Sequence, residues 1–554
     1  MTQTKSAMKR ASTSDGDRER FARLMQARLA TAALLASAGG IALVASRPAS
    51  AITPQLAPDA GPLRALAAAA RFIGLDQVGT GFAAALSAAL LVAAAAAFVY
   101  SLRLAWGGRL ALRRILVVGV LLHAVVLVLP LLFSRDVYSY TAYGRIVSEY
   151  GRNPYVATPQ EFPDDPIYPV VSRFWVDSPS VYGPAFSAAA AGVTSVAESP
   201  ASSVVAFKTI AAIASAATMF LVASAARRAR PERAAFAAAL VGWNPVVVFH
   251  GVGGGHNDAI VGLSLAGAVL LLLDRRELAA TAVLVVGALV KAVVAVPLLI
   301  MVAAAVASRR SGARMRTLAA HAGIAALAGL PFVIPFFQTE DPTLGQFELA
   351  GRAGWLAPSR FVYVSLRGVA RWIGGQTGAE LISLVVRLAF AALLLAAVVA
   401  IIRHVVRAGR RLDPMVVIAG MGWGLLLTLV LSPILLPWYV AWVVPLAWLL
   451  PRPARDGVVI VSVALAITEI VAEPSRAPGA WEAMVFALHW IATPLVLLMA
   501  VALLADLRRR VRLGPTGGTR DPLLLEDGAL WPARLKPWFD VRPRIQRRQP
   551  IRRR

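Results

Sequence analysis

Long apolar runs recur along the chain, and short polar segments rich in arginine separate them. A bilayer core is roughly 30 Å thick and requires about 20 residues of helix, so these runs have the length of membrane spans. They are filled with Ala, Val and Leu and lack the in-and-out alternation of an outer-membrane barrel. Helices satisfy their own backbone hydrogen bonds in lipid. The pattern therefore predicts an all-α polytopic integral membrane protein.

Hydropathy predicts about 13 transmembrane helices. The predicted segments are 30–46, 82–102, 114–133, 203–225, 234–250, 257–273, 278–307, 316–337, 380–402, 413–433, 436–450, 456–472 and 482–505. The segment 278–307 is too long for one straight span at about 1.5 Å per residue, and Lys291 lies in its middle. We expect two short helices there, with Lys291 near the turn between them.

Arginine-rich clusters between the spans set the predicted orientation. All of the clusters can face the cytoplasm if 278–307 is split in two and the apolar piece Pro184–Ala197 lies on the membrane instead of crossing it. The first apolar run resembles a signal peptide, but its long basic stretch and the spans that follow it favour an uncleaved helix.

This orientation divides the chain into three parts. Residues 1–29 form a basic cytoplasmic tail, 30–507 form the transmembrane domain, and 508–554 form a basic cytoplasmic tail that we expect to be disordered or held on anionic lipid. The two long outward loops are 134–202 and 338–379. Long ordered loops tend to be functional, and 134–202 is dense in Tyr, Pro, Asp and Trp. We expect it to form a structured cap over a substrate.

The composition narrows the possible functions. The 554 residues are 58% hydrophobic and 16% charged, whereas an average soluble protein carries about 25% charged residues. The net charge of +26 comes from clusters between spans and in both tails, not from one basic face, so we expect no nucleic-acid partner. The absence of cysteine excludes disulfides, thiolate metal sites and cysteine nucleophiles.

A carboxylate lies at the outer end of the third predicted span. Asp136 follows Arg135 and precedes Tyr138 there. An acid at this depth can meet a lipid-borne substrate, but it can also cap a helix or pair with Arg135. Its position alone leaves both interpretations open.

A second polar cluster lies between two predicted spans, at Gly253–Asp258. Its three glycines permit a tight turn that presents His256, Asn257 and Asp258 at the outer membrane edge. The cluster predicts a substrate-binding role, with helix capping by Asp258 as the alternative. One His and one Asp are too few to predict a metal site.

Lys291 is the most anomalous residue of the membrane region, because an ammonium inside an apolar run costs on the order of 3 kcal/mol unless it is paired. It needs an anion, which can be a lipid phosphate or a neighbouring carboxylate. Arg352 and Arg360, in the outward loop 338–379, can join Lys291 on a phosphate.

Aromatic residues accompany these polar groups on the predicted outer side. They are Tyr182 before Gly183-Pro184, and Trp438 and Tyr439 after Pro437. Aromatic rings can cover the apolar face of a sugar, although interfacial Tyr and Trp also simply anchor membrane proteins.

The costly polar groups thus gather on the outer side, where no nucleotide-sugar pool exists. No Walker loop or dinucleotide fingerprint occurs in the chain. A glycosyltransferase working there requires an activated donor carried in the membrane, which points to a polyprenyl-phosphate sugar.

Taken in order, these motifs resemble those of the polyprenol-phosphomannose-dependent α-1,6-mannosyltransferases of actinobacteria, which belong to the GT-C superfamily. The resemblance rests on six motifs, which are Arg135-Asp136-Val137-Tyr138-Ser139-Tyr140, Asn153-Pro154-Tyr155, Tyr182-Gly183-Pro184, Gly255-His256-Asn257-Asp258, Lys291 and Pro437-Trp438-Tyr439. It implies an inverting transfer of mannose from a polyprenyl monophosphate to a lipid-anchored, growing α-1,6-mannan of lipomannan and lipoarabinomannan type, outside the plasma membrane.

The resemblance also implies roles for single residues. Asp136 would be the catalytic base that deprotonates the acceptor hydroxyl. Lys291, with Arg352 or Arg360, would bind the donor phosphate. The expected contacts of sugar and acceptor are Tyr138, Tyr182, His256, Asn257, Asp258, Trp438 and Tyr439. We expect no metal and no cofactor besides the lipid-linked donor, which is a substrate.

A second acidic residue often accompanies the base in this superfamily, and none stands next to Asp136. Asp164 or Asp165 could supply it from the loop. The rival functions are a secondary transporter and a lipid-linked sugar flippase, since many spans and an intramembrane lysine suit both. A transporter predicts internal repeats, and the two halves of the chain show no clear one.

Overall fold

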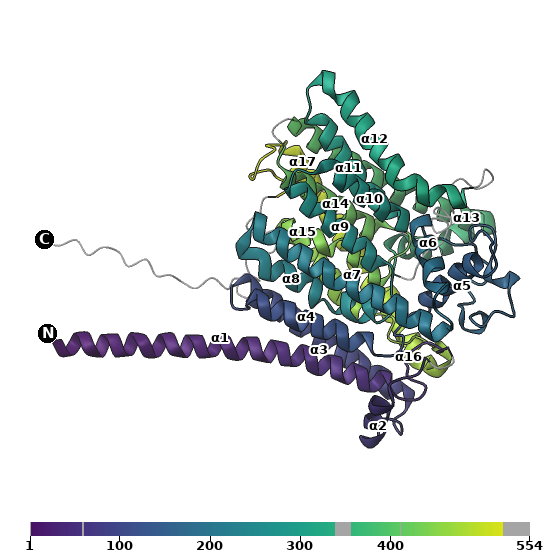
Figure 1. Ribbon diagram of the computed structural model, residues 1–554, viewed down its shortest axis with the longest axis horizontal. Coiled ribbons are helices and arrows are strands. Elements are labelled where there is room, and N and C mark those ends of the chain that lie inside the picture. The colour runs from purple at the N-terminus through teal and green to yellow at the C-terminus, as the bar shows by residue number, and fades with distance from the viewer. Residues whose placement is uncertain (1, 58–59, 338–355, 410–411, 525–554) are drawn as a thin grey trace.

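The computed structural model describes residues 2–57, 60–337, 356–409 and 412–524 (Figure 1). Over these residues the regular elements are helices, and none is a strand. The α-helices are α1 (Thr2–Ala45), α2 (Arg64–Phe72), α3 (Thr80–Trp106), α4 (Leu112–Leu127), α5 (Asp136–Ser148), α6 (Pro184–Thr194), α7 (Pro200–Ala229), α8 (Ala234–Gly242), α9 (Asp258–Leu273), α10 (Glu277–Val290), α11 (Ala295–Ala307), α12 (Ser311–Val333), α13 (Pro358–Ala408), α14 (Pro414–Leu431), α15 (Arg452–Ala466), α16 (Pro478–Ala487) and α17 (Thr493–Arg512).

Eight helical segments within the described residues are long and apolar enough to cross a membrane. They are Leu24–Ala45, Thr80–Trp106, Pro200–Ala229, Pro231–Val252, Ser311–Phe336, Pro358–Ala408, Pro414–Leu431 and Pro478–Arg512. Three shorter apolar helices, Asp258–Leu273, Glu277–Val290 and Ala292–Ala307, lie among them. The all-α membrane class is confirmed, and the count of about 13 spans stays a prediction.

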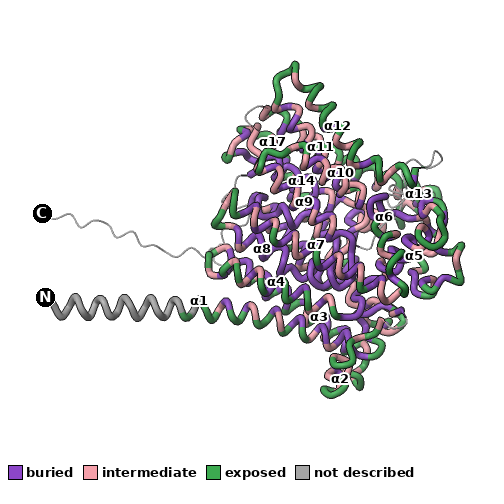
Figure 2. Tube along the Cα trace, in the orientation of Figure 1, coloured by how far each residue is buried: buried purple, intermediate pink, exposed green. Residues whose placement is uncertain are grey.

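The helices form one bundle whose centre and edge differ in burial (Figure 2). In the segment that contains α8, 94% of the apolar window is buried, whereas in α12 the share is 11%. The exposed residues of α12 are still apolar, as Leu327 at 74% exposure illustrates. Apolar side chains that face outward are what a lipid environment requires, so α8 lies at the centre of the bundle and α12 at its edge.

The expected break at Lys291 is confirmed. Helix α10 ends at Val290, Lys291 has extended backbone angles (φ −153°, ψ 124°), and a 3-10 turn leads into α11. The piece expected to lie on the membrane forms α6, which has 11 residues and packs against α5. At about 1.5 Å per residue α6 is too short to cross the bilayer.

Gly183 joins α6 to the break at Lys291. Its backbone N–H donates to the Val290 carbonyl at 3.2 Å. A Cβ at this position would lie 2.0 Å from the Leu289 carbonyl oxygen, so only glycine allows the approach. The contact places the neighbouring Tyr182 beside the end of α10.

Two predicted segments differ from the structure. Residues 436–450 are not an α-helical span but two 3-10 helices, η9 (Pro437–Trp442) and η10 (Val444–Leu449), each with a proline in its first turn. The outward segment predicted as a loop over 338–379 is helical from Pro358 onward, where α13 begins, and its backbone leaves helical geometry at Gly374 and Gly375, where a kink joins two helices.

The expected disorder of the tail from residue 508 is wrong for its first part. Helix α17 continues to Arg512, and the chain then folds back so that Asp521 meets His404 of α13 at 2.9 Å. Arg510 donates to the Pro522 carbonyl at 2.7 Å. Buried ionic groups of this kind need partners. The polar composition of the tail predicted disorder because it does not show that some of its residues pair with buried groups.

Candidate active site

Asp136 is the first residue of α5. It lies at the end of the bundle that carries the loop 134–202, which we call the loop end. Its backbone N–H donates to the Ser134 hydroxyl at 3.1 Å, and the side chain of Arg135, which precedes the helix, makes no capping bond. Arg135 forms its ion pair with Glu473 instead, so the pairing of Asp136 with Arg135 does not occur. The Asp136 side chain keeps 20% exposure.

The surrounding protein raises the pKa of Asp136 to about 6. Desolvation of the carboxylate is the main cause, and the charge of Asp258 adds to it. Lys291 and the Ser134 hydroxyl oppose the shift because they stabilise the charged form. Such a carboxylate titrates close to neutral pH, as a general base requires.

The next turn of α5 brings Tyr140, not Tyr138, to the same side as Asp136. Residues four apart share a face of a helix, whereas residues two apart do not. The Tyr140 hydroxyl lies 3.4 Å from Nδ1 of His256. The Tyr138 hydroxyl instead accepts from the Ala57 N–H at 2.9 Å, and the residue is fully buried. Tyr140, not Tyr138, thus lies beside His256, which the helical spacing could have indicated, and the sugar contact of Tyr138 stays a prediction.

Tyr182 joins the site through Tyr140. The two rings meet edge to face with centroids 4.8 Å apart. Phe186 packs on both rings, at 4.8 Å from Tyr140 and 5.6 Å from Tyr182. These contacts fix the face of α5 that carries Asp136 against α6.

His256 projects from the glycine turn that precedes α9. Gly255 has a φ of 63°, and a Cβ on Gly254 would lie 2.6 Å from the His256 ring, so the turn requires glycine at both positions. Nδ1 of His256 lies 3.6 Å from Oδ2 of Asp136. The His256 ring stacks on Trp438 with centroids 3.6 Å apart.

The imidazole of His256 is neutral at physiological pH. Burial lowers its pKa well below the ordinary value, and the charge of Lys291 lowers it further. A neutral ring carries one N–H donor and one acceptor nitrogen, so His256 can both donate and accept a hydrogen bond.

The ammonium of Lys291 meets the carboxylate of Asp258 at 2.8 Å. Oδ1 of Asp258 also accepts from the indole N–H of Trp442. The ammonium lies 4.4 Å from the centre of the Tyr439 ring. Thus the anion that Lys291 needed is Asp258, and an aromatic face adds further stabilisation.

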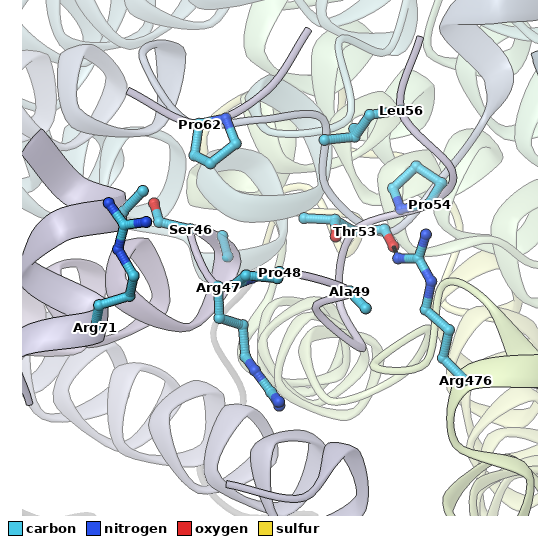
Figure 3. A pocket seen from close by; sticks show the side chains of 12 residues that line it. Ser46, Arg47, Pro48, Ala49, Thr53, Pro54, Leu56, Pro62, Arg71 and Arg476 are labelled. Carbon is cyan, nitrogen blue, oxygen red and sulfur yellow. Dashed lines mark hydrogen bonds between the residues drawn. The ribbon is translucent and has the colours of Figure 1, made fainter. Parts of the chain in front are cut away.

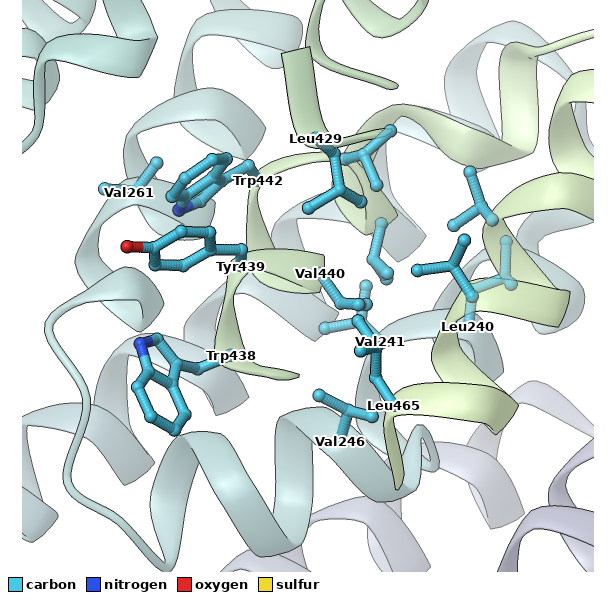
Figure 4. Close-up of a cluster of buried hydrophobic side chains, with 14 of the residues drawn as sticks. Leu240, Val241, Val246, Val261, Leu429, Trp438, Tyr439, Val440, Trp442 and Leu465 are labelled. Carbon is cyan, nitrogen blue, oxygen red and sulfur yellow. The ribbon is translucent and has the colours of Figure 1, made fainter. Parts of the chain in front are cut away.

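The aromatic residues of η9 project to one side of their 3-10 helix, as Figure 4 shows. Tyr439 and Trp442 stack with centroids 4.0 Å apart. Residues three apart eclipse one another in a 3-10 helix, which has three residues per turn. The departure from α-helical geometry at 437–442 therefore produces this aromatic wall, with Trp438 next to it on His256.

Several polar atoms at this site are buried and have no hydrogen-bond partner within the described part of the chain. They are Nε2 of His256, Oδ1 and Nδ2 of Asn257, and Oδ2 of Asp258. Leaving such atoms unpaired is costly, so a group of them is a sign of a binding site for a hydrogen-bonding ligand. Sugar hydroxyls both donate and accept, and they match this set.

Glu469 is a second carboxylate near Asp136 that the sequence did not indicate. It follows α15 with a φ of 57°, in the left-handed region that glutamate rarely adopts. Desolvation raises its pKa to about 7, and the charge of Asp136 adds to the shift. The Ala472 N–H donates to the Ala51 carbonyl at 2.8 Å, which holds this segment near α5.

The acids expected from the loop do not meet Asp136. The Asp165 carboxylate is buried and pairs with Nε of Arg145 at 2.9 Å, and it accepts from the Tyr150 hydroxyl at 2.8 Å. Asp164 is exposed. Asp165 thus has a structural role, and the second acid beside Asp136 stays a prediction.

Two arginines, Arg352 and Arg360, are predicted to assist Lys291. Arg352 lies outside the described residues. Arg360 is in the first turns of α13, where its charged neighbours include Arg367 and His489. Their roles on a phosphate stay predictions. Within the described ranges, no group of three or more His, Cys, Asp and Glu could hold a metal ion.

The fold and this site define a polytopic α-helical membrane protein with one polar, aromatic-lined site at the loop end of its bundle. A sequence model of the family described as alpha-(1->6)-mannopyranosyltransferase, N-terminal domain, matches residues 34–308, a range that includes Asp136, His256 and Lys291. The chain is similar to this family over that range, which is just under half of its length. The resemblance inferred from the sequence motifs is thereby confirmed.

Known relatives carry the family's name. Alpha-(1->6)-mannopyranosyltransferase A of Mycobacterium tuberculosis is 27% identical over 387 residues, which cover 65% of this chain and 69% of that protein. Alpha-(1->6)-mannopyranosyltransferase B of Corynebacterium glutamicum is 32% identical over 134 residues, which cover 24% of this chain and 22% of that protein. No solved structure is a significant match to the chain.

Removing one member of the Lys291–Asp258 pair should destabilise the fold. Lys291→Met leaves a buried carboxylate without its cation, so the free energy of unfolding should fall by about 3–5 kcal/mol. Lys291→Met combined with Asp258→Asn removes both charges and should recover most of that loss. The measurement is thermal unfolding of the purified protein in detergent. A double variant no more stable than Lys291→Met would contradict the pairing.

Proposed function

We propose that this chain transfers mannose from polyprenyl-phosphate mannose to a growing α-1,6-mannan of lipomannan and lipoarabinomannan type. The observation that carries the proposal is the meeting of Asp136, His256 and the Lys291–Asp258 pair at one site with unpartnered polar atoms. The names of the relatives support mannose as the sugar and the α-1,6 linkage. The product would be one mannose longer.

The step needs one base and one cation. Asp136 takes the proton of the acceptor 6-hydroxyl while that oxygen forms a bond to C1 of mannose. The bond between C1 and the phosphate oxygen breaks on the opposite face, and its electron pair leaves with the polyprenyl monophosphate. The configuration at C1 inverts. The elevated pKa of Asp136 suits it to accept this proton near neutral pH.

Lys291 is placed to stabilise the departing phosphate. An ammonium has three N–H donors, and one of them is directed at Asp258. The other two can bind phosphate oxygens, where a fixed positive charge lowers the barrier more than a solvated one does. Asp258 and Trp442 then act as positioning residues that hold the ammonium. The proposal involves no metal.

The sugar and the acceptor would lie between the aromatic wall and the glycine turn. Trp438 and Tyr439 offer ring faces for the apolar side of a sugar. His256 and Asn257 offer unpartnered donors and acceptors for its hydroxyls. A polyprenyl chain would remain in the lipid beside the bundle, so donor and lipid-anchored acceptor would both reach the site from the membrane.

The proposal places the site on the extracytoplasmic face of the plasma membrane. The basic clusters support this orientation, because arginine-rich loops stay in the cytoplasm. The loop 134–202 and the α2 segment lie at the same end of the bundle as the start of α5 (Figure 1).

The natural absence of cysteine allows a direct test of this orientation. Ser195→Cys, in the outward loop, should react with a membrane-impermeant maleimide in intact cells, because Ser195 is exposed. Ser311→Cys is the matched variant at an exposed position of the opposite end, and it should react only after lysis. Labelling with the reverse pattern would place the site in the cytoplasm.

Loss of the base should abolish transfer without loss of the fold. Asp136→Asn should lower mannosyl transfer by about 10²–10⁴-fold, the usual contribution of a general base. The assay uses reconstituted protein, radiolabelled polyprenyl-phosphate mannose and a short α-1,6-mannoside acceptor. Asp164→Asn is the matched control in the same loop and should keep full activity.

Donor binding and the melting temperature of Asp136→Asn should match those of the natural protein. An Asp136→Asn variant that transfers mannose at the natural rate would remove Asp136 from the mechanism. A natural protein silent with mannose, arabinose and glucose donors would point to a transporter.

The pH dependence should report the ionisation of Asp136. Asp136 must be ionised to act as a base, so kcat/KM should fall as the pH drops through about 6. Glu469 has the higher pKa, about 7, so it is mostly protonated where Asp136 titrates. Glu469→Gln should therefore leave this limb in place, as should Glu482→Gln at an exposed position of α16. A limb that moves to lower pH in Glu469→Gln alone would mean that Glu469 is ionised there and contradict this order of titration.

A further inference from the structure

A cavity of about 280 Å³ lies apart from the site around Asp136, at the end of α1 (Figure 3). Its walls come from the segment that follows α1, from α2 and from the turn before α16. Three arginines line it, and the rest of the lining is mostly proline, alanine and leucine. The lining residues are Ala45, Ser46, Arg47, Pro48, Ala49, Thr53, Pro54, Leu56, Pro62, Ala67, Arg71 and Arg476.

The three arginines give the cavity a net positive charge, because none of its lining residues is acidic. Arg71 and Arg476 lie on opposite sides of it in Figure 3. Arg476 is fixed by donating to the Ser50 and Thr53 carbonyls at 3.1 and 2.9 Å. Asp59 lies outside the described residues.

Arg47 is the strongest indication that this cavity binds an anion. The residue is only 7% exposed, and Nε and Nη1 of its guanidinium have no hydrogen-bond partner within the described residues. Nη2 donates to the Val78 carbonyl at 2.6 Å. Burial lowers the pKa of Arg47, and the charge of Asp76 partly opposes this. A buried guanidinium with unsatisfied donors is stabilised by an anion.

The surroundings of the cavity are those of a membrane surface. Helix α2 carries Arg64 and Arg71, and apolar residues at its two ends are exposed. These are Leu63 at 51%, Phe72 at 91% and Ile73 at 55%. Short amphipathic helices with basic and bulky apolar residues lie in the plane of the lipid headgroups, with the apolar residues among the acyl chains.

We propose that this cavity binds the phosphodiester headgroup of a glycerophospholipid, with Arg47, Arg71 and Arg476 around the phosphate and the acyl chains leaving along α2. Cationic and apolar walls together match a molecule that has a charged head and two chains. The Lys291 site is separate, so this would be a second lipid site besides that of the donor. The proposal does not depend on the proposed function.

The test is native mass spectrometry of the full-length protein in detergent, titrated with dioctanoyl-phosphatidylglycerol. The natural protein should bind one equivalent above the background of weak lipid adducts. Arg71→Gln removes an exposed guanidinium and should weaken this binding about tenfold, the loss expected for one charged hydrogen bond. Arg64→Gln is the matched control, because it makes the same change on α2 away from the cavity.

Two further probes separate the possible ligands. Dioctanoylglycerol has the same chains without a phosphate and should bind much more weakly than the phospholipid. Glycerol 3-phosphate has the phosphate without chains and should also bind weakly. Arg47→Gln should lose affinity as Arg71→Gln does, but the exposed Arg71 carries the test if Arg47→Gln fails to fold.

Three results would overturn the proposal. Equal affinity of the natural protein and Arg71→Gln would remove the arginines from the site. Equal binding of dioctanoylglycerol would show that no phosphate is recognised. Glycerol 3-phosphate that binds as tightly as the phospholipid would make this a site for a free phosphate instead of a lipid.

Discussion

The site depends on one ion pair, formed where the chain cannot continue as a helix. The ammonium of Lys291 would be costly in an apolar bundle, and the Asp258 carboxylate at the start of α9 compensates for it at 2.8 Å. The backbone is extended at Lys291, so the side chain can point at this carboxylate. The same break ends α10 at the place where Gly183 docks. One pair thus fixes α9, α10 and α6 relative to each other.

Asp136 owes its position to segments from both ends of the chain. The Phe133 N–H donates to the Ile52 carbonyl at 2.8 Å, ahead of α5. Arg135 pairs with Glu473, more than three hundred residues later. The family match ends at residue 308, yet Trp438 and Glu473 come from beyond it. Asp136 and Lys291 therefore belong to the matched part of the chain. The part after residue 308 contributes Trp438 beside His256 and Glu473 as the partner of Arg135.

The sequence indicated those parts of the site that are costly in a membrane. Lys291, Asp136 and the glycine turn before Asp258 could be found because charged groups and glycine clusters are rare in apolar runs. The break at Lys291 followed from the length of its run. The four-residue spacing from Asp136 indicates Tyr140, but the motif contains several tyrosines, and residue type alone does not distinguish them.

Other features could not be read from the sequence for physical reasons. Glu469 lies near Asp136 only because tertiary contacts hold its segment near α5, and no local pattern encodes that. The 3-10 geometry of η9 arises in a run as apolar as any span. Asp165 lies in the same loop as Asp136 and was therefore predicted as a possible second acid. Its carboxylate instead forms an ion pair with Arg145 of α5.

The return of the chain after α17 has a consequence for the order of biosynthesis. His404 is buried in α13, and its Nε2 is paired with Asp521, which is synthesised more than a hundred residues later. Helix α13 can enter the membrane while Asp521 is still untranslated. The end of α13 that carries His404 then lacks its acidic partner until the segment with Asp521 has left the ribosome. The bundle is therefore completed only after the apolar segments up to α17 have been delivered to the membrane.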